Sequence, residues 1–189
     1  MREMVMTHEQ ILQAAKEVGE KLNLELVNEE KIPVFIGVMK GAIHFMADLL
    51  KNINIPVFVD YIQISSYFGT ERTGQINLVK DLTYDIKDRT IVIVEDVIDT
   101  GLSMEYLVNH LKAKYQPKKV IIASLFDKIY ARKNDIICHF SGYVLQENKF
   151  LVGYGLDYKE LFRNLPYVFI PDDEDIKNWD EAINKSEGI

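Results

Sequence analysis

The sequence predicts an α/β fold with an open, mostly parallel, twisted sheet flanked by helices. Apolar runs at residues 34–39, 90–94 and 119–126 lack a polar face, as is typical of strands covered on both sides. Helical patterns follow the first two runs, which predicts βαβ units with right-handed crossovers. With 189 residues, 48% hydrophobic and 27% charged, the chain can form one sizeable core, so we expect a single domain over residues 1–189.

Residues 7–23 predict an amphipathic helix. Thr7 and Gln10 have the spacing of a capping box, in which side chains satisfy the backbone N–H groups at a helix start. The apolar residues that follow have helical spacing and predict a buried stripe: Ile11, Leu12, Ala15, Val18 and Leu22.

The next segment predicts a strand, a tight turn and a helix. The apolar run of residues 34–39 ends at Lys40 and Gly41, and apolar residues then continue at helical spacing. The predicted stripe of this helix is Ile43, Met46, Ala47 and Leu50.

A loop separates the next two predicted strands, at residues 57–65 and 76–82. Glycine and threonine interrupt every periodicity between them, so residues 66–75 are predicted to form a mobile loop.

The second half of the chain begins with the strand at residues 90–94 and an acidic turn. A helix then carries Met104, Leu107, Val108 and Leu111 and ends before Pro117. After the strand at residues 119–126, shorter strands are predicted at residues 140–146, 150–154 and 167–170. The acidic tail is predicted to be a terminal helix or a frayed end, which Trp179 docks.

Composition excludes several classes of function. A formal net charge of −7 argues against a general nucleic-acid binder, which needs a basic surface. The single cysteine, Cys138, excludes an internal disulfide framework and is predicted to be a small core residue. No apolar signal region follows Met1, and no run approaches the ~18 apolar residues of a membrane span. We therefore expect a cytoplasmic protein without a membrane partner.

Ligands of open α/β sheets bind at the carboxyl ends of the strands, which singles out two turns. One is Lys40–Gly41 and the other is Glu95–Ser103, within the stretch VIVEDVIDTGLS. Residues 100–103 offer hydroxyls and N–H groups at a helix start, where a phosphate is favoured. Simple helix capping by Asp99, Thr100 and Ser103 would explain this part equally well.

Helix capping needs only one carboxylate, so it does not explain the presence of Glu95 and Asp96. Carboxylates beside a phosphate site suit the hydroxyls of a ribose or the hydration shell of Mg²⁺, so the turn predicts a phosphorylated sugar. Other phosphate motifs fail: GxxxxGK[ST] is absent, and Gly153 and Gly155 lack the third glycine of GxGxxG. The four histidines show no metal-binding spacing.

These motifs resemble a known family. The segment VEDVIDTG closely resembles the phosphoribosyl pyrophosphate motif of type I phosphoribosyltransferases, and the order of motifs along nearly the whole chain is similar to that of hypoxanthine-guanine phosphoribosyltransferases. The motifs are VMKG (Val38–Gly41), SY (Ser66–Tyr67), VEDVIDTG (Val94–Gly101), FDK (Phe126–Lys128), NKFLVGYGLDY (Asn148–Tyr158) and FRNLP (Phe162–Pro166). The resemblance implies a small hood subdomain, built from the N-terminal segment and about residues 140–189.

The resemblance implies roles for the acidic turn. Glu95 and Asp96 would hold the ribose hydroxyls and bind Mg²⁺, and Asp99 would be the catalytic general base beside the purine. The 5′-phosphate would be bound by the rest of the turn: Thr100, Gly101, Leu102 and Ser103. Leu102 stands where some family members carry lysine, so it would contribute only its backbone N–H group.

The resemblance also implies a pyrophosphate site. Lys40 and Gly41 would belong to a loop that begins with a non-proline cis peptide, although Lys40 alone would be interpreted as a solvated lysine at a helix start. Arg163 would grip pyrophosphate with its guanidinium group, and Asp157 would hold a second Mg²⁺.

On the purine side, Lys128 would donate a hydrogen bond to O6, which favours 6-oxopurines over adenine. Phe150 would stack on the base, and the Leu151 backbone would contact its edge. Taken alone, Lys128 could snorkel at a strand end and Phe150 could be a core residue. Ser66 and Tyr67 would begin a loop that closes over the substrates and excludes water.

The resemblance thus implies a Mg²⁺-dependent enzyme that makes IMP or GMP and pyrophosphate from phosphoribosyl pyrophosphate and hypoxanthine or guanine. The resemblance also suggests a homodimer or homotetramer. A second hypothesis is a regulator that senses the sugar pyrophosphate and binds nucleic acid without catalysis. A third, a sugar-phosphate phosphatase with an aspartyl nucleophile, is disfavoured because Asp96 and Asp99 are not in an Asp-x-Asp pair.

Overall fold

The computed structural model describes residues 2–66 and 76–187. Its helices and strands are β1 (Glu3–Met6), α1 (His8–Leu26), β2 (Val34–Met39), α2 (Ile43–Leu50), β3 (Phe58–Ser66), β4 (Ile76–Lys80), β5 (Thr90–Ile98), α3 (Leu102–Tyr115), β6 (Lys119–Asp127), the 3₁₀ turn η1 (Ile129–Ala131), β7 (Phe140–Val144), β8 (Val168–Ile170) and α4 (Asp173–Glu187). No helix in this part of the chain is long and apolar enough to cross a membrane.

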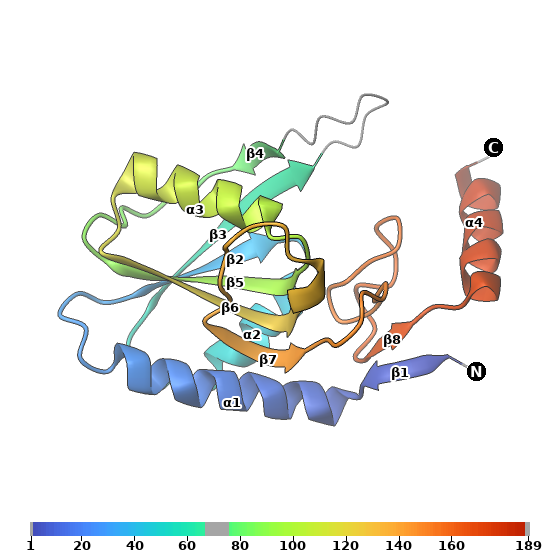
Figure 1. Ribbon diagram of the computed structural model, residues 1–189, viewed down its shortest axis with the longest axis horizontal. Helices are drawn as coiled ribbons and strands as arrows, with labels where there is room; N and C mark the ends of the chain where they lie inside the picture. Colours follow the sequence, from blue (N-terminus) through green and yellow to red (C-terminus); the bar gives the residue numbers. More distant parts are fainter. Residues whose placement is uncertain (1, 67–75, 188–189) are drawn as a thin grey trace.

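A six-stranded sheet in the order β4-β3-β2-β5-β6-β7 forms the body of the protein (Figure 1). All neighbouring strands are parallel except β3 and β4, which are antiparallel. The predicted class, an α/β fold with a mostly parallel sheet flanked by helices, is therefore confirmed.

Helices cover both faces of this sheet, with α1 and α2 on one face and α3 on the other (Figure 1). Side chains of β5 alternate between two cores: Val92 and Val94 pack with α1 and α2, whereas Ile91 and Ile93 pack with α3. Full burial of such side chains stabilises the fold by about 1.5–3 kcal/mol each. Burial on both faces explains why this strand has no polar side.

The capping box of α1 is confirmed, because Thr7 and Gln10 each bond to the backbone N–H of the other. Leu12, however, is exposed, and the buried stripe instead includes Ala14 and Leu26. Leu12 follows Ile11 directly, so it is turned by about 100° around the helix and away from the core.

The predicted stripe of α2 was wrong in part. Ile43 and Ala47 are exposed, while Phe45, Met46 and Leu49 are buried. The helix is apolar on nearly all sides, so two alternative stripes that share Met46 fit the pattern equally well.

Several predicted strands differ from the observed ones; for example, the strand expected at residues 140–146 ends at Val144. The strand expected at residues 76–82 ends at Lys80, and the strand expected at residues 90–94 continues to Ile98. The strand predicted at residues 150–154 is wrong: this segment makes only isolated bridges, from Val152 to Phe169 and from Gly153 to Leu156. Positive φ angles at its last two residues, Gly153 and Tyr154, break the extended conformation.

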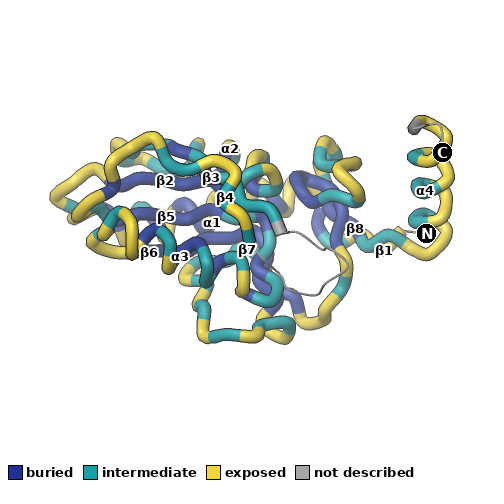
Figure 2. Tube along the Cα trace, turned by 90° about the horizontal axis from the view of Figure 1, so that it is seen from above, coloured by how far each residue is buried: buried dark blue, intermediate teal, exposed yellow. Residues whose placement is uncertain are grey.

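Both ends of the described chain meet beside the main sheet. Strands β1 and β8 form a separate antiparallel pair, and Arg2 forms a 2.7 Å ion pair with Asp175 of α4. Trp179 docks α4 as predicted, with its ring centroid 4.1 Å from that of Phe162. Figure 2 shows this part extending from one end of the body.

Cys138 is partly buried beneath β6, near the hydroxyl of Ser124. Burial raises the pKa of its thiol to about 11, which keeps it protonated at neutral pH. This agrees with the predicted packing role.

Candidate active site

A cleft of about 530 Å³ opens at the carboxyl ends of β2 and β5. The two strands are adjacent, but the chain continues from β2 to β3 on one side and from β5 to β6 on the other. Ligands bind at such a topological switch point because the connections diverge and leave a crevice. The cleft is lined by Val38, Met39, Lys40, Gly41, Gln63, Ile64, Ser65, Glu95, Asp96, Val97, Ile98, Asp99, Thr100, Gly101, Ser103, Met104, Asp157, Glu160 and Arg163.

The loop after β2 begins with the expected cis peptide between Met39 and Lys40. Gly41 packs directly on Asp96, since a Cβ atom at Gly41 would lie 2.0 Å from a carboxylate oxygen. Glycine is therefore required for the loop to approach β5. The Lys40 side chain is half exposed, and its Nζ atom lies 2.8 Å from Glu160.

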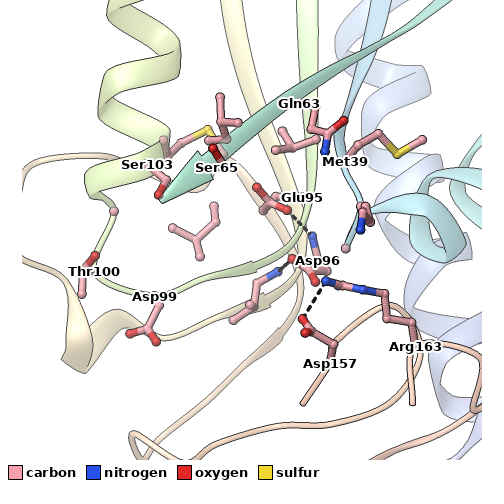
Figure 3. A pocket seen from close by; sticks show the side chains of 18 of the residues that line it. Met39, Gln63, Ser65, Glu95, Asp96, Asp99, Thr100, Ser103, Asp157 and Arg163 are labelled. Carbon is pink, nitrogen blue, oxygen red and sulfur yellow. Dashed lines mark hydrogen bonds and ion pairs between the residues drawn. The ribbon is translucent and has the colours of Figure 1, made fainter. Parts of the chain in front are cut away.

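Glu95 and Asp96 lie within β5 at the floor of the cleft, not in the turn after the strand (Figure 3). The Asp96 N–H donates to Oε1 of Glu95 over 3.1 Å, and the Val97 N–H donates to Oδ1 of Asp96 over 2.7 Å. Burial and the neighbouring charge of Asp96 raise the pKa of Glu95 well above its usual value, and burial also raises the pKa of Asp96. A cation would relieve this repulsion.

Oxygen donors of this kind suit Mg²⁺, which takes one or two carboxylates and completes its shell with water and phosphate oxygens. In the part of the chain that the structure describes, no group of three His, Cys, Asp or Glu side chains could hold a metal ion alone. The third predicted ligand, Asp157, is instead paired with Arg163. Glu95 and Asp96 thus fit a metal ion that is shared with a phosphorylated ligand.

The turn after β5 leads into α3 without a side-chain cap. Its N-cap residue, Gly101, has φ 83°, and no side chain accepts a capping hydrogen bond there. The contact from Leu102 N–H to Thr100 Oγ1 is long, at 3.5 Å. Simple helix capping therefore does not account for Thr100 and Ser103, and the first turn of α3 keeps N–H groups for an anion.

Lys128 joins the end of β6 to Asp99. Its side chain is only 8% exposed, so it does not snorkel to the surface, and its Nζ atom lies 3.3 Å from Oδ2 of Asp99. The Asp99 side chain is 47% exposed and lines the cleft. A buried ammonium group needs such a partner because desolvation is costly.

Arg132 supports this corner and was missed by the sequence analysis. Its guanidinium group donates to the Asp99 carbonyl over 3.2 Å and forms an ion pair with Asp127. It also donates to the Ile136 carbonyl over 2.5 Å. The residue thus fixes the ends of β5 and β6 together.

Residues from the C-terminal part complete the opposite wall (Figure 3). Arg163 forms a 2.8 Å ion pair with Asp157 and donates to the Gly155 carbonyl over 2.6 Å. Gly155 has φ 99°, and a Cβ atom there would lie 2.0 Å from the Gly41 carbonyl oxygen. This close approach places Arg163 and Asp157 beside the loop after β2.

Several other predicted residues, including the buried Lys128, do not line the cleft. Phe150 is 52% exposed, Leu151 is buried and Leu102 is exposed, and none of the three lines the cleft. Ser66 ends β3, whereas Tyr67 and the rest of the predicted loop lie outside the described residues.

Three further residues that were not predicted from the sequence line the cleft: Gln63, Ser65 and Glu160. Gln63 and Ser65 alternate along β3, and this polar alternation at a strand end could have indicated them. No local pattern indicates Glu160, because its role depends on contacts with distant residues.

Comparison with known proteins identifies similar sequences. Residues 1–159 match the family model described as "Phosphoribosyl transferase domain". The chain is 38% identical over 179 residues to the hypoxanthine-guanine phosphoribosyltransferase of Streptococcus pneumoniae, which covers 94% of this chain and 97% of that protein. It is 40% identical over 169 residues to the protein of the same name from Bacillus subtilis, covering 89% and 92%.

Solved structures give the same result. A crystal structure of a hypoxanthine phosphoribosyltransferase from Staphylococcus aureus is similar with a TM-score of 0.85 and 36% identity, over 92% of this chain and 93% of that one. A hypoxanthine-guanine phosphoribosyltransferase from Bacillus anthracis has a TM-score of 0.82 and 31% identity, over 91% and 99%.

Proposed function

This chain belongs to the hypoxanthine-guanine phosphoribosyltransferase family, and from that premise we propose how its cleft carries out the reaction. It is an enzyme of purine salvage that transfers the 5-phosphoribosyl group from phosphoribosyl pyrophosphate to N9 of hypoxanthine or guanine. The products are IMP or GMP and pyrophosphate. The regulator and phosphatase hypotheses are set aside.

One observation carries the assignment of the sugar phosphate: a repelling carboxylate pair and an uncapped helix start line the same cleft. Thr100, Gly101 and Ser103, with the Leu102 N–H group, would bind the 5′-phosphate through groups that α3 leaves unpaired. Glu95 and Asp96 would accept hydrogen bonds from the ribose hydroxyls. The cleft would thus present N–H groups to the phosphate and carboxylates to the ribose of the same ligand.

Mg²⁺ would be held by Glu95 and Asp96, with Asp157 beside a second ion. When bound, the metal neutralises charge on the pyrophosphate group and orients it for departure. Lys40 and Arg163 would bind the same group from opposite sides, and the Gly41 N–H would add a backbone donor. Together these residues stabilise the leaving group as the bond to C1 breaks.

Asp99 would accept the N7 proton of the purine as N9 attacks C1. Lys128, which already contacts Asp99, would donate a hydrogen bond to O6. Adenine carries an amino group at this position and would meet a donor with a donor, so 6-oxopurines are preferred. Phe150 would stack on the base, and the Leu151 backbone would contact its edge.

The proposal extends to the organisation of the protein. Pairing of β1 with β8 and the docking of α4 support a hood formed by the N-terminal segment and about residues 140–189 of a single 1–189 domain. A homodimer or homotetramer, a cytoplasmic location and the roles of Ser66 and Tyr67 stay predictions.

Release of pyrophosphate tests the function directly. Purified protein with phosphoribosyl pyrophosphate and Mg²⁺ should release it when hypoxanthine or guanine is added, and much less when adenine is added. Absence of release with either base, together with tight RNA or DNA binding, would favour the regulator instead. Comparing kcat/KM for hypoxanthine, guanine and xanthine then gives the base preference.

A further inference from the structure

Glu160 connects the two cations of the proposed pyrophosphate site. Its Oε2 atom lies 2.8 Å from Nζ of Lys40, and its Oε1 atom lies 3.4 Å from Nη2 of Arg163. One carboxylate therefore bridges side chains from two segments that are far apart in the sequence. Its two anionic oxygens thus contact the two cations to which the proposed function assigns the pyrophosphate group.

The backbone fixes Glu160 in this place. Hydrogen bonds between Tyr158 and Leu161 close a two-residue turn, whose central residues Lys159 and Glu160 have φ 48° and 69°. Asn-Gly is preferred at such positions because side chains strain the backbone there. Here both side chains make ion pairs, Lys159 with Asp180 at 2.8 Å and Glu160 with Lys40. The turn therefore orients the two side chains toward their partners.

A ligand can displace the Glu160 carboxylate from the cations that it contacts. Glu160 is an exposed glutamate in an ion pair with Lys40, so it carries a negative charge at neutral pH. Both side chains of this pair are more than half exposed, and pairs of this kind contribute little to stability because water screens them. A ligand with greater negative charge can therefore displace Glu160 from the cations.

We propose that Glu160 is a resident anion that competes with pyrophosphate for Lys40 and Arg163 and thereby sets how tightly the leaving group is held. The proposal rests on the pyrophosphate site described above. Without a ligand, Glu160 pairs with Lys40 and shares Arg163 with Asp157. After the transfer it returns to them and lowers the affinity of the product, which favours release.

Calorimetric titration of Glu160→Gln with sodium pyrophosphate, with and without Mg²⁺, tests this role. Loss of the competing charge should lower the pyrophosphate Kd about two- to fivefold, the range expected from an exposed ion pair. Glu147→Gln is the matched control, because Glu147 pairs with Lys149 at 3.2 Å and does not line the cleft. It should bind pyrophosphate like the wild type. An unchanged or higher Kd for Glu160→Gln would overturn the proposal.

A second background separates a direct contact from a general charge effect. In a Lys40→Gln protein, Glu160→Gln should lower the Kd by a smaller factor, because one of the contested cations is gone. An equal factor in both backgrounds would show that only net charge matters and would refute the competition.

Arg163→Gln distinguishes this inference from the proposed site itself. Pyrophosphate binding that survives intact in Arg163→Gln contradicts the site. Binding lost in Arg163→Gln but unchanged in Glu160→Gln leaves the site standing and rejects the role of Glu160.

Discussion

Lys128 donates a hydrogen bond of 3.3 Å from its buried Nζ atom to the Oδ2 atom of Asp99. The pair joins the end of β6 to the turn after β5, and Arg132 holds the same turn through the Asp99 carbonyl. The proposed proton acceptor and the proposed contact for O6 are thus in place before a purine arrives. Preorganised groups of this kind lose little entropy when the substrate binds.

Asp99→Asn should lower kcat by about 10²-fold or more, the usual contribution of a general base, while the Kd for phosphoribosyl pyrophosphate changes far less. Steady-state kinetics and calorimetry measure the two quantities. Asp135→Asn removes the same charge at an exposed position and should leave kcat and Kd unaffected. An equal loss of kcat and binding in Asp99→Asn would argue against the role of Asp99 as a base.

Glu95→Gln should stabilise the unliganded protein at neutral pH. The pKa of Glu95 is raised in the folded state, so the free energy of unfolding falls as pH rises from the unfolded value, about 4.3, through the folded value. Removing the charge should raise Tm by about 2–4 °C, equivalent to about 1 kcal/mol, and weaken binding of phosphoribosyl pyrophosphate with Mg²⁺.

The gain from Glu95→Gln should vanish below about pH 4, where the wild-type residue is protonated in both states. Glu30→Gln, an exposed control, should show no such pH dependence. Thermal unfolding across this pH range checks the prediction, and a Tm at neutral pH no higher than that of the wild type would contradict it.

Asp60→Ala should destabilise the protein by about 2 kcal/mol, because several donors lose their acceptor. The Asp60 carboxylate is almost fully buried and accepts from the N–H groups of Tyr61, Thr83 and Tyr84. Urea unfolding measures the loss, with the exposed Asp85→Ala as a control that should cost under about 0.5 kcal/mol.

This contribution of Asp60 should depend on pH. Burial acts to raise its pKa, but the hydrogen bonds outweigh burial and lower it. Asp60 therefore stabilises the fold above its unfolded pKa of about 3.9, and the stabilisation is lost as pH falls through the lower folded value. A difference between wild type and Asp60→Ala that grows with acidification would refute this account.

Gly155→Ala and Gly153→Ala form a matched pair. Both residues have positive φ, and an added Cβ atom would lie 2.0 Å from a carbonyl oxygen in each case, so both changes should cost about 1–3 kcal/mol. The oxygen belongs to Gly41 for Gly155 and to Tyr167 for Gly153. Only Gly155→Ala should raise the pyrophosphate Kd about tenfold, because it displaces the Lys40 loop. Equal Kd values in the two variants would contradict the idea that Gly155 positions the Lys40 loop for pyrophosphate.

Much of the fold follows from local patterns. The strand at residues 34–39 is buried on both sides and has the predicted bounds, and the Thr7 capping box marks the start of α1. The strand predicted at residues 150–154 fails because the backbone at Gly153 and Tyr154 turns to positive φ to meet distant contacts. Burial of one face cannot be predicted where a short helix such as α2 is apolar all round.

The site was predictable where the sequence contains more charge than local structure needs. Glu95 and Asp96 stood out for that reason. The burial of Lys128 and the contacts of Arg132 and Glu160 depend on residues far along the chain, such as Asp99 and Lys40. Such contacts arise from the tertiary fold, so local spacing does not indicate them.

The pairing of β1 with β8 has a consequence for synthesis. Glu3 pairs with Ile170, so the second sheet cannot form on the ribosome until residue 170 has emerged. The strands β2 to β7 emerge earlier and can assemble around their two cores. We therefore expect the nascent chain to fold its body, with the Lys40 loop, first and to add Arg163 to the pyrophosphate site afterwards.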